Sequence, residues 1–319
     1  MAEVILFGEP MALFIGQEYG TLKNVTTFKK ALAGAELNVC IGLTRLKHTT
    51  TYITKLGRKD PFGAYIYESL HNENIDTSNV SFDDEYTTGF MLKSKVKEGN
   101  PDISYFRKNS AASHIAPEDI EKVSFDHVRH VHVTGIPCAL SESCLASSLR
   151  LIERAHEHHV YVSFDPNLRP SLWKSQAVMA KTLNDIACRC DMVLPGLSEG
   201  EILTGLHDAK NIADYYLSKG VRDVVIKTGK KGAYIQNAET CAQVPSFPVE
   251  EFSKVVDTVG AGDGFAVGVI SGRLEGLSLK DAVVRGNVIG GLQLTVEGDN
   301  EGLPDRGQLA EAMTHLSAD

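Results

Sequence analysis

The alternation of short apolar runs with longer segments of helical periodicity is the feature that most restricts the folds open to this chain. Strands are predicted at Val4–Gly8, Thr51–Thr54, Val131–Thr134, Tyr161–Phe164, Met192–Leu194 and Val224–Lys227. Between them, apolar residues recur with the period of an amphipathic helix in Glu36–Lys47, Phe62–Asn72, Glu142–His158 and Ile212–Lys219. This alternation predicts an α/β fold in which helices cover both faces of a mostly parallel central sheet, giving a three-layer α/β/α core.

Two segments, Met11–Phe28 and Thr87–Phe106, depart from this pattern because apolar and polar residues alternate in them with no helix between. A period of two is typical of exposed antiparallel strands. We therefore expect a small β-sheet lid over a binding site, with strands inserted at about residues 11–33 and 86–107. No linker, low-complexity tract or repeat divides the chain, so residues 1–319 are predicted to form one domain.

The composition excludes several functional classes. A formal net charge of −9 disfavours broad nucleic-acid binding, which needs clustered Lys and Arg. No apolar run approaches the roughly 18 residues that cross a bilayer, and the N-terminus lacks the regions of a signal peptide. The 6 cysteines show no disulfide or metal-site spacing, so we expect reduced thiols in a cytoplasmic protein without a membrane partner. His127, His130 and His132 are interpreted as strand residues, since no Cys or carboxylate completes a metal site.

The strongest local signal for chemistry is the string D-T-V-G-A-G-D from Asp257 to Asp263, which leads directly into a helical pattern. Glycines allow backbone N–H groups to crowd together, and a helix N-terminus adds partial positive charge. Gly260, Ala261 and Gly262 are therefore predicted to hold a phosphoryl group. Asp263 would then accept the proton of the attacking hydroxyl.

Other interpretations of this glycine-rich string compete with phosphoryl transfer. The nucleotide-binding loop G-x-x-x-x-G-K-S/T does not occur in the chain. The dinucleotide pattern G-x-G-x-x-G of a nicotinamide dehydrogenase would need glycine where Phe265 stands. The plain structural alternative is a helix start, with Asp263 as a cap and glycines for a tight turn.

The string Asp257–Asp263 resembles the signature of the PfkB family, the ribokinase-like carbohydrate kinases. Ala33–Asn38 is similar to the family's glycine-rich substrate motif, Leu56–Gly63 to its L-G-x-D-x-F-G segment, and Lys227–Gly232 to its K-x-G-x-x-G nucleotide loop. The motifs occur in family order over essentially the full length. The resemblance implies a ribokinase-like fold and an ATP-dependent sugar kinase that uses Mg²⁺, and it leaves room for a monovalent cation near Asp257.

Within that family, the chain looks most like the kinases of 2-keto-3-deoxygluconate (KDG), a sugar acid. Leu13 stands where fructokinases and ribokinases usually carry an Asp that binds sugar hydroxyls. Tyr105–Ser113 and Gly298–Pro304 are similar to segments of the KDG kinases. Since a guanidinium matches a carboxylate with two parallel hydrogen bonds, Arg107 and Arg169 are candidates to bind the carboxylate of KDG. The resemblance implies phosphorylation of the 6-hydroxyl, giving 2-keto-3-deoxy-6-phosphogluconate.

The resemblance also assigns roles to individual positions. The catalytic positions are the base Asp263 and the anion hole of Gly260, Ala261 and Gly262. The substrate-binding positions are Gly34, Phe90, Tyr105, Arg107, Arg169, Asp263 and Asp299. The ATP-binding positions are Asn167, Arg169, Lys227, Thr228, Gly229, Gly232, Gly260, Gly262 and Asn287.

Two positions depart from the family pattern. Gly196 replaces the Asn of the family's N-x-x-E motif. This leaves Glu199 either as an indirect contributor to metal binding or as an acidic residue that favours the dipole of a helix N-terminus. Phe90 stands where KDG kinases often carry Tyr, so one hydroxyl group is missing there.

Other functions stay open at this point. The nearest alternatives are a fructokinase or a 5-dehydro-2-deoxygluconokinase. A non-catalytic sugar or nucleotide sensor on the same fold is the alternative from another class, although a sensor need not keep the base Asp263. The expected partners are a small sugar acid, ATP and further copies of the chain. The copies would associate through the lid sheet, because its apolar surface needs covering.

Overall fold

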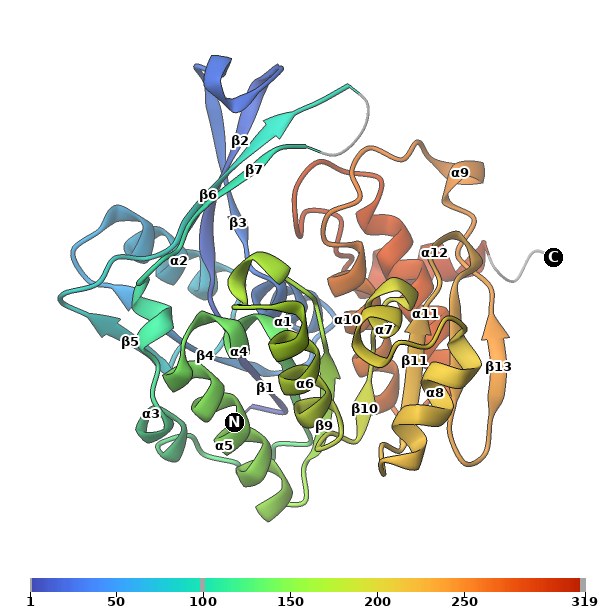
Figure 1. Ribbon diagram of the computed structural model, residues 1–319. Coiled ribbons are helices and arrows are strands. Elements are labelled where there is room, and N and C mark those ends of the chain that lie inside the picture. Colours follow the sequence, from blue (N-terminus) through green and yellow to red (C-terminus); the bar gives the residue numbers. More distant parts are fainter. Residues whose placement is uncertain (1, 98–100, 316–319) are drawn as a thin grey trace.

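Figure 1 shows the computed structural model of the protein, which describes residues 2–97 and 101–315. The larger of its two sheets has nine strands in the order β13-β12-β11-β10-β9-β8-β1-β4-β5. In that order, the strands are Cys241–Val244, Ala233–Gln236, Asp223–Lys227, Met192–Val193, Tyr161–Asp165, His130–Thr134, Val4–Phe7, Thr50–Gly57 and Val80–Asp83. Neighbours from β11 to β5 run parallel, whereas β12 and β13 pair in antiparallel fashion. The expectation of a mostly parallel sheet is confirmed.

Helices cover both faces of this large sheet (Figure 1). One face carries α3 to α8, which are Pro117–Glu121, Gly135–Leu140, Glu142–Glu157, Gln176–Ala187, Leu197–Thr204 and Ala209–Ser218. The other face carries α1, α2 and α9 to α12, which are Ala35–Arg45, Pro61–Asn72, Val249–Phe252, Ala261–Leu274, Leu279–Gln293 and Arg306–Thr314. The molecule therefore has the three layers that the sequence predicts.

Strand β1 shows why two layers of helices are needed. All of its residues are buried, and successive side chains of a strand point to opposite faces. Ile5 and Phe7 belong to the core that includes α5 and α6, whereas Val4 and Leu6 belong to the core that includes α1 and α10. A strand that is apolar on both faces leaves water only when helices cover both.

Capping side chains set helix boundaries that periodicity alone places loosely. The predicted helix Ile212–Lys219 is α8, but it begins earlier, at Ala209. The reason is Asp208, whose carboxylate accepts a hydrogen bond from the backbone N–H of Asn211 at 2.9 Å. Such a cap satisfies a donor that the first turn of a helix leaves unpaired.

The cysteines and the central histidines are structural residues of the large sheet and its helices. The 6 cysteines are free, and all except Cys188 and Cys241 are buried. His130 and His132 lie on β8, where His130 Nε2 and His132 Nδ1 contact Ser163 Oγ at 2.7 and 2.8 Å. Burial lowers the pKa of each imidazole to about 3, so both rings are neutral. Among the described helices, none has the length and hydropathy needed to span a bilayer.

The second sheet, called the small sheet below, rises from one side of the main body (Figure 1) and has the order β3-β2-β6-β7. Its strands are Phe28–Ala33, Met11–Tyr19, Phe90–Lys95 and Ile103–Phe106. The outer pairs are antiparallel, but the central pair β2–β6 is parallel. The expectation of antiparallel strands is therefore wrong for that pair. Between β2 and β6 the chain leaves the small sheet and forms β4 and β5 of the large sheet. It then re-enters the small sheet from the same end, so β6 runs in the same direction as β2.

Candidate active site

A cavity of about 400 Å³ lies between the carboxyl ends of the parallel strands and the small sheet. Asp165 ends β9 and Lys227 ends β11, while Met91 and Tyr105 reach the cavity from β6 and β7. Carboxyl ends of parallel strands meet at one edge, where α/β folds bind ligands. The predicted site residues that line this cavity are Gly34, Tyr105, Arg107, Asn167, Arg169, Glu199, Lys227, Gly260, Gly262, Asp263 and Asp299.

The start of α10 presents unpaired backbone N–H groups to the cavity. Gly260 precedes the helix with φ +80, and a Cβ atom there would collide with the carbonyl oxygen of Asp299, so only glycine fits. The N–H groups of Ala261, Gly262 and Asp263 have no hydrogen-bond acceptor among the described residues. Three free donors at the positive end of a 14-residue helix form a site for an anion.

Asp263 sits in this first turn and is held by a chain of amides. Asn38 Nδ2 on α1 donates to Asp263 Oδ2 at 2.7 Å, and Asn300 Nδ2 donates to Asn38 Oδ1 at 3.0 Å. Burial raises the pKa of Asp263 to about 6, and the nearby Asp165 acts in the same direction. The hydrogen bond from Asn38 opposes that rise. The result is an oriented carboxylate whose proton affinity suits a general base near neutral pH.

Lys227 and Asp165 form a buried ion pair across the strand ends. Lys227 Nζ donates to Asp165 Oδ2 at 2.6 Å, and Asp165 Oδ1 accepts from the N–H of Asn167 at 3.1 Å. Burial acts to lower the pKa of Lys227, but Asp165 and Glu199 outweigh it and keep the pKa above its ordinary value. A Cβ atom on Gly262 would meet nothing nearer than Lys227 Nζ, at 3.8 Å. The ammonium therefore lies next to the open face of the α10 N-terminus.

Arg107, at the end of β7, is held from behind by Glu9. Its Nε donates to Glu9 Oε2 at 2.6 Å, and Nη2 lies 2.5 Å from the same oxygen. Ser110 Oγ donates to the other carboxylate oxygen. Both Arg107 and Glu9 are buried, and Nη1 of Arg107 has no partner among the described residues. One edge of the guanidinium is thus used by the protein, and the other is available to a ligand.

Arg169 and Glu199 lie on the opposite side of the cavity. Arg169 Nη1 donates to the carbonyl of Leu168 at 2.9 Å and does not pair with Asp165, so its charge is available. Glu199 accepts from the N–H groups of Gly196 and Leu168 at 2.7 and 2.8 Å. Glu199 therefore caps α7 and ties it to the loop after β9. Glu199 thus has the role at a helix N-terminus that was considered above, although Gly196 stands where the family motif has Asn.

Asp299 carries a buried oxygen that has no hydrogen-bond partner within residues 2–97 and 101–315. This atom, Oδ1, lies 3.8 Å from Lys93 Nζ. Burial raises the pKa of Asp299 to about 7, and the carboxylates of Asp263 and Asp257 add to the rise, whereas Lys93 opposes it. Asp299 lines the cavity, so an incoming hydroxyl group is a suitable donor for the unpaired oxygen.

Several predicted positions lie outside the cavity lining. Phe90 points to the face of β6 opposite Met91 and stacks on Phe106, with ring centroids 4.6 Å apart. Asn287 on α11 donates from Nδ2 to the carbonyl of Pro245 at 2.7 Å. The remaining positions outside the lining are Ala261, Thr228, Gly229 and Gly232. Roles in ligand binding at all of these positions stay predictions.

The structure also brings residues to the site that sequence reasoning missed. Asn38 stands in the quoted motif Ala33–Asn38, one helical turn after Gly34, so its spacing was a usable signal. Asp165 directly follows an apolar strand, which also marks the active edge of a parallel sheet. Glu9 offered no local signal, because its partner Arg107 is 98 residues away in the chain.

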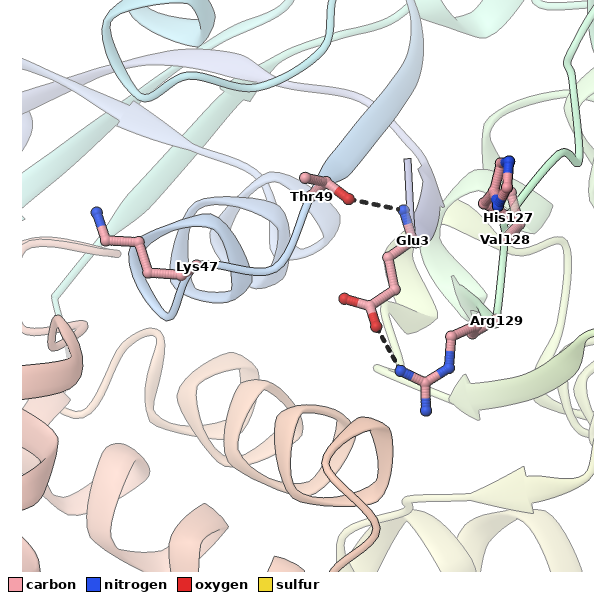
Figure 2. A pocket seen from close by; sticks show the side chains of 6 residues that line it. All are labelled: Glu3, Lys47, Thr49, His127, Val128 and Arg129. Atoms are coloured by element: carbon pink, nitrogen blue, oxygen red, sulfur yellow. Dashed lines mark hydrogen bonds and ion pairs between the residues drawn. The ribbon is translucent and has the colours of Figure 1, made fainter. Parts of the chain in front are cut away.

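A second hollow, of about 440 Å³, lies at the amino ends of the central strands (Figure 2). Among the described residues that line it, Glu3 carries the one carboxylate. Figure 2 shows this carboxylate paired with Arg129, and the backbone N–H of Glu3 donating to Thr49 Oγ1. Glu3 Oε1 accepts from Arg129 Nη1 at 2.6 Å, and Glu3 Oε2 contacts His48 Nδ1 at 2.9 Å. Both oxygens of the Glu3 carboxylate are therefore engaged by protein side chains, in contrast to Asp299 Oδ1 in the first cavity.

Comparison with known proteins decides the family. Residues 1–306 match the sequence profile described as pfkB family carbohydrate kinase. The chain is a PfkB family carbohydrate kinase. The match covers the start of α10, where the string Asp257–Asp263 predicted this family, and both sheets.

Relatives of this PfkB kinase agree with that assignment. The chain is 48% identical over 313 residues to a 2-dehydro-3-deoxygluconokinase of Bacillus subtilis (strain 168), covering 98% of this chain and 95% of the relative. The crystal structure of a PfkB protein from Polaromonas sp. JS666 superposes with a TM-score of 0.87 at 40% identity, covering 97% of this chain and 99% of that one. A putative ribokinase II from E. coli, in its apo form, has a TM-score of 0.90 at 22% identity, covering 99% and 100%. The ribokinase-like fold is confirmed.

Proposed function

We propose that this kinase transfers a phosphoryl group from ATP to the 6-hydroxyl of KDG, which is another name for 2-dehydro-3-deoxygluconate. The observation that carries the proposal is the buried carboxyl of Asp263 at the unpaired start of α10, in a cavity that also holds Arg107 and Arg169. The 48% identity to the B. subtilis enzyme supports this substrate over the fructokinase and 5-dehydro-2-deoxygluconokinase alternatives.

Asp263 acts as the general base. With a pKa of about 6, its carboxyl is ionised at pH 7 and can accept the proton of the 6-hydroxyl as that oxygen attacks. Asn38 keeps the carboxylate oriented through its hydrogen bond to Oδ2. The N–H groups of Ala261, Gly262 and Asp263 stabilise negative charge on the transferred phosphoryl group, because they are fixed in place before the reaction.

Arg107 selects a sugar acid over a neutral sugar. Glu9 holds the Nε edge of the guanidinium, which leaves the Nη edge to face the carboxylate of KDG. Arg169, on the other side of the cavity, adds positive charge, and its side-chain hydrogen bond goes to the carbonyl of Leu168 rather than to a carboxylate. Asp299 accepts a hydrogen bond from a substrate hydroxyl through its unpaired oxygen. Tyr105 and Gly34 complete the lining on the side of the small sheet.

The nucleotide lies on the side of Lys227 and the turn that follows it. Lys227 sits beside the open face of Gly262 and supplies positive charge to the phosphates. Asn167 lines the same side of the cavity, while Thr228, Gly229, Gly232 and Asn287 are proposed to contact the nucleotide beyond it. These assignments rest on the family resemblance together with the placement of Lys227.

The donor set of the cavity suits a magnesium ion that is bound together with the phosphates of ATP. Among the described residues, no cluster of three or more His, Cys, Asp or Glu side chains could hold a metal ion by itself. Mg²⁺ commonly binds through one or two carboxylates plus phosphate oxygens. Asp165 lines the cavity and would hold the ion here, whereas Glu199, whose two oxygens already accept backbone N–H groups, would contribute only indirectly. Bound there, Mg²⁺ neutralises phosphate charge. A monovalent cation near Asp257 stays a prediction.

We also propose that the small sheet is the lid of a single kinase domain. Its face toward the cavity carries Met91 and Tyr105, so it can exclude water from the reacting groups. Tyr19, Tyr105 and Phe106 are exposed on this sheet, which supports association of copies through it. The free cysteines support a reducing, cytoplasmic location.

The test is a coupled assay of ADP release with Mg-ATP and KDG, fructose, ribose or 5-dehydro-2-deoxygluconate at equal concentration. Strong preference for KDG is the expected result. Preference for fructose or ribose would keep the kinase and discard the carboxylate role of Arg107. Preference for 5-dehydro-2-deoxygluconate would replace the substrate. No ADP with any compound would favour a non-catalytic sensor.

A further inference from the structure

Lys93 on β6 is a buried lysine that joins the small sheet to the loop before α10. Its Nζ donates to Asp257 Oδ2 at 2.5 Å and lies 3.8 Å from Asp299 Oδ1. All three side chains are nearly inaccessible, with 4% exposure for Lys93 and 9% and 8% for the two carboxylates. The first contact spans 164 residues of sequence and connects the small sheet to the loop that precedes α10.

The environment of this pair argues that it specifies one position of the small sheet. Moving an ammonium and a carboxylate out of water is costly, and their attraction repays that cost only with good geometry and further hydrogen bonds. Lys93 and Asp257 therefore stay dry only while the small sheet is docked in this position. If the sheet moved away, both charges would return to water. The cost of removing both charges from water offsets much of their attraction, so such a pair adds little to overall stability.

Both carboxylates that Lys93 approaches belong to elements of the active site. Asp257 lies in the loop before α10, and its Oδ1 accepts the N–H of Val259 at 3.2 Å, so its side chain shapes the approach to the helix start that carries Asp263. Asp299 lines the cavity, and its carbonyl oxygen abuts Gly260. A displacement of the Lys93 ammonium would therefore disturb the geometry of both the anion hole and the sugar side of the cavity.

We propose that Lys93 is a positioning residue that docks the small sheet onto Asp257, in the loop that leads into α10, and onto Asp299. This contact couples two features of the enzyme. One is the position of the small sheet over the cavity, and the other is the arrangement of the groups that bind sugar and phosphate. The inference rests on the proposed kinase function. Its consequence is that loss of the ammonium weakens sugar binding and lets water replace the sugar hydroxyl as phosphoryl acceptor.

Lys95 provides a matched control on the same strand and the same face. Its Nζ pairs with Glu297 at 3.1 Å, close in sequence to Asp299, but both side chains are partly exposed, at 28% and 32%. Exposed pairs contribute little because water screens them. Removing Lys95 deletes one lysine from the same sheet without opening a buried charge.

The experiment compares Lys93→Met, Lys93→Arg and Lys95→Met with the parent enzyme, using ADP release with and without KDG. We expect Lys93→Met to raise KM for KDG about tenfold or more and to increase the share of ADP formed without sugar phosphate. Lys93→Arg should restore part of the coupling, and Lys95→Met should stay within about twofold. Parent-like KM and coupling in Lys93→Met would overturn the proposal.

Hydrogen exchange separates failure of this inference from failure of the proposed function. Without any substrate, amides of β6 and β7 should exchange faster in Lys93→Met than in Lys95→Met, whatever reaction the enzyme performs. Equal exchange in the two variants would overturn the docking role. If Lys93→Met does not fold, Lys93→Gln keeps a hydrogen-bond donor without the charge and is measured in its place, with the same expected and contrary results.

Discussion

The two ends of the large sheet carry similar residue types and differ in how completely those residues are paired. At the amino end, the Glu3 carboxylate uses both oxygens on Arg129 and His48, and Arg129 is 56% exposed. At the carboxyl end, Arg107 and Asp299 are buried, yet each keeps an atom without a hydrogen-bond partner in the described part of the chain. Burial fixes the positions of the charged groups at the carboxyl end, and their unused hydrogen-bonding atoms can bind a ligand. This combination is typical of an active site.

The largest expected contrast between the two ends comes from removing the base. Asp263→Ala should fold normally and lose about 10²- to 10⁴-fold in kcat, because a positioned base supplies acceleration of that order. Glu3→Ala, at the amino end, is the matched control and should keep the parent kcat. ADP release with KDG and thermal unfolding measure both properties. A parent-like kcat in Asp263→Ala would show that the base lies elsewhere.

Removal of Arg107 should affect binding more than turnover. A hydrogen bond to a charged group contributes about 1.5–3 kcal/mol, so Arg107→Ala should raise KM for KDG by about 10- to 150-fold. The measurement is a substrate titration with KDG, repeated with Arg129→Ala as the control at the amino end. An unchanged KM in Arg107→Ala would remove this residue from the substrate site.

The fall in rate at acid pH, which is the acid limb of the rate profile, should be determined by Asp263, at the carboxyl end of the sheet. Asp263 must be ionised to act as base, and burial raises its pKa to about 6. We therefore expect kcat/KM to fall about tenfold per pH unit below that pKa and to level off above it. Titration of the rate between pH 5 and 8 measures this limb. A limb displaced to the ordinary range of Asp, about pH 4, would contradict the burial argument.

The free energy of unfolding should fall in acid partly because of the two buried histidines of β8. His130 and His132 have a pKa of about 3 in the folded protein, below their value of 6.5 when unfolded. The unfolded chain thus binds more protons, so the stability they contribute is present above pH 6.5 and is lost as the pH falls toward 3. Each accounts for up to about 1.4 kcal/mol per pH unit. Denaturant unfolding at several pH values should show a shallower loss in His132→Asn than in the parent.

The smallest effect is expected from Arg129→Ala. Its ion pair with Glu3 is half-exposed and should contribute no more than about 1 kcal/mol to the free energy of unfolding. The kinetic constants for KDG should not change. A loss of activity comparable to that of Arg107→Ala would mean that the amino end also takes part in function, which would break the contrast between the two ends.

The residues that could be predicted from sequence are those whose reason is local. Gly260 adopts a positive φ just before a helix, and Asp263 follows within its first turn, so both belong to one short string. Gly34, with φ +138, also stands at the start of a helix, and a Cβ atom there would lie 2.9 Å from the carbonyl oxygen of Glu9, so glycine is required. The face of β6 that carries Phe90 depended instead on register with β2 and β7, which no single segment encodes.

The amino-acid sequence by itself determined the layered α/β architecture and the family, and it led to the prediction that Asp263 is the base, because hydrophobic period and glycine spacing act over a few residues. Tertiary structure alone decided the parallel pairing of β2 with β6, the support of Arg107 by Glu9 and the docking of Lys93 on Asp257. It also set the pKa of Asp263, through burial. These properties depend on groups brought together from distant parts of the chain and on their exclusion from water, which only the folded molecule establishes.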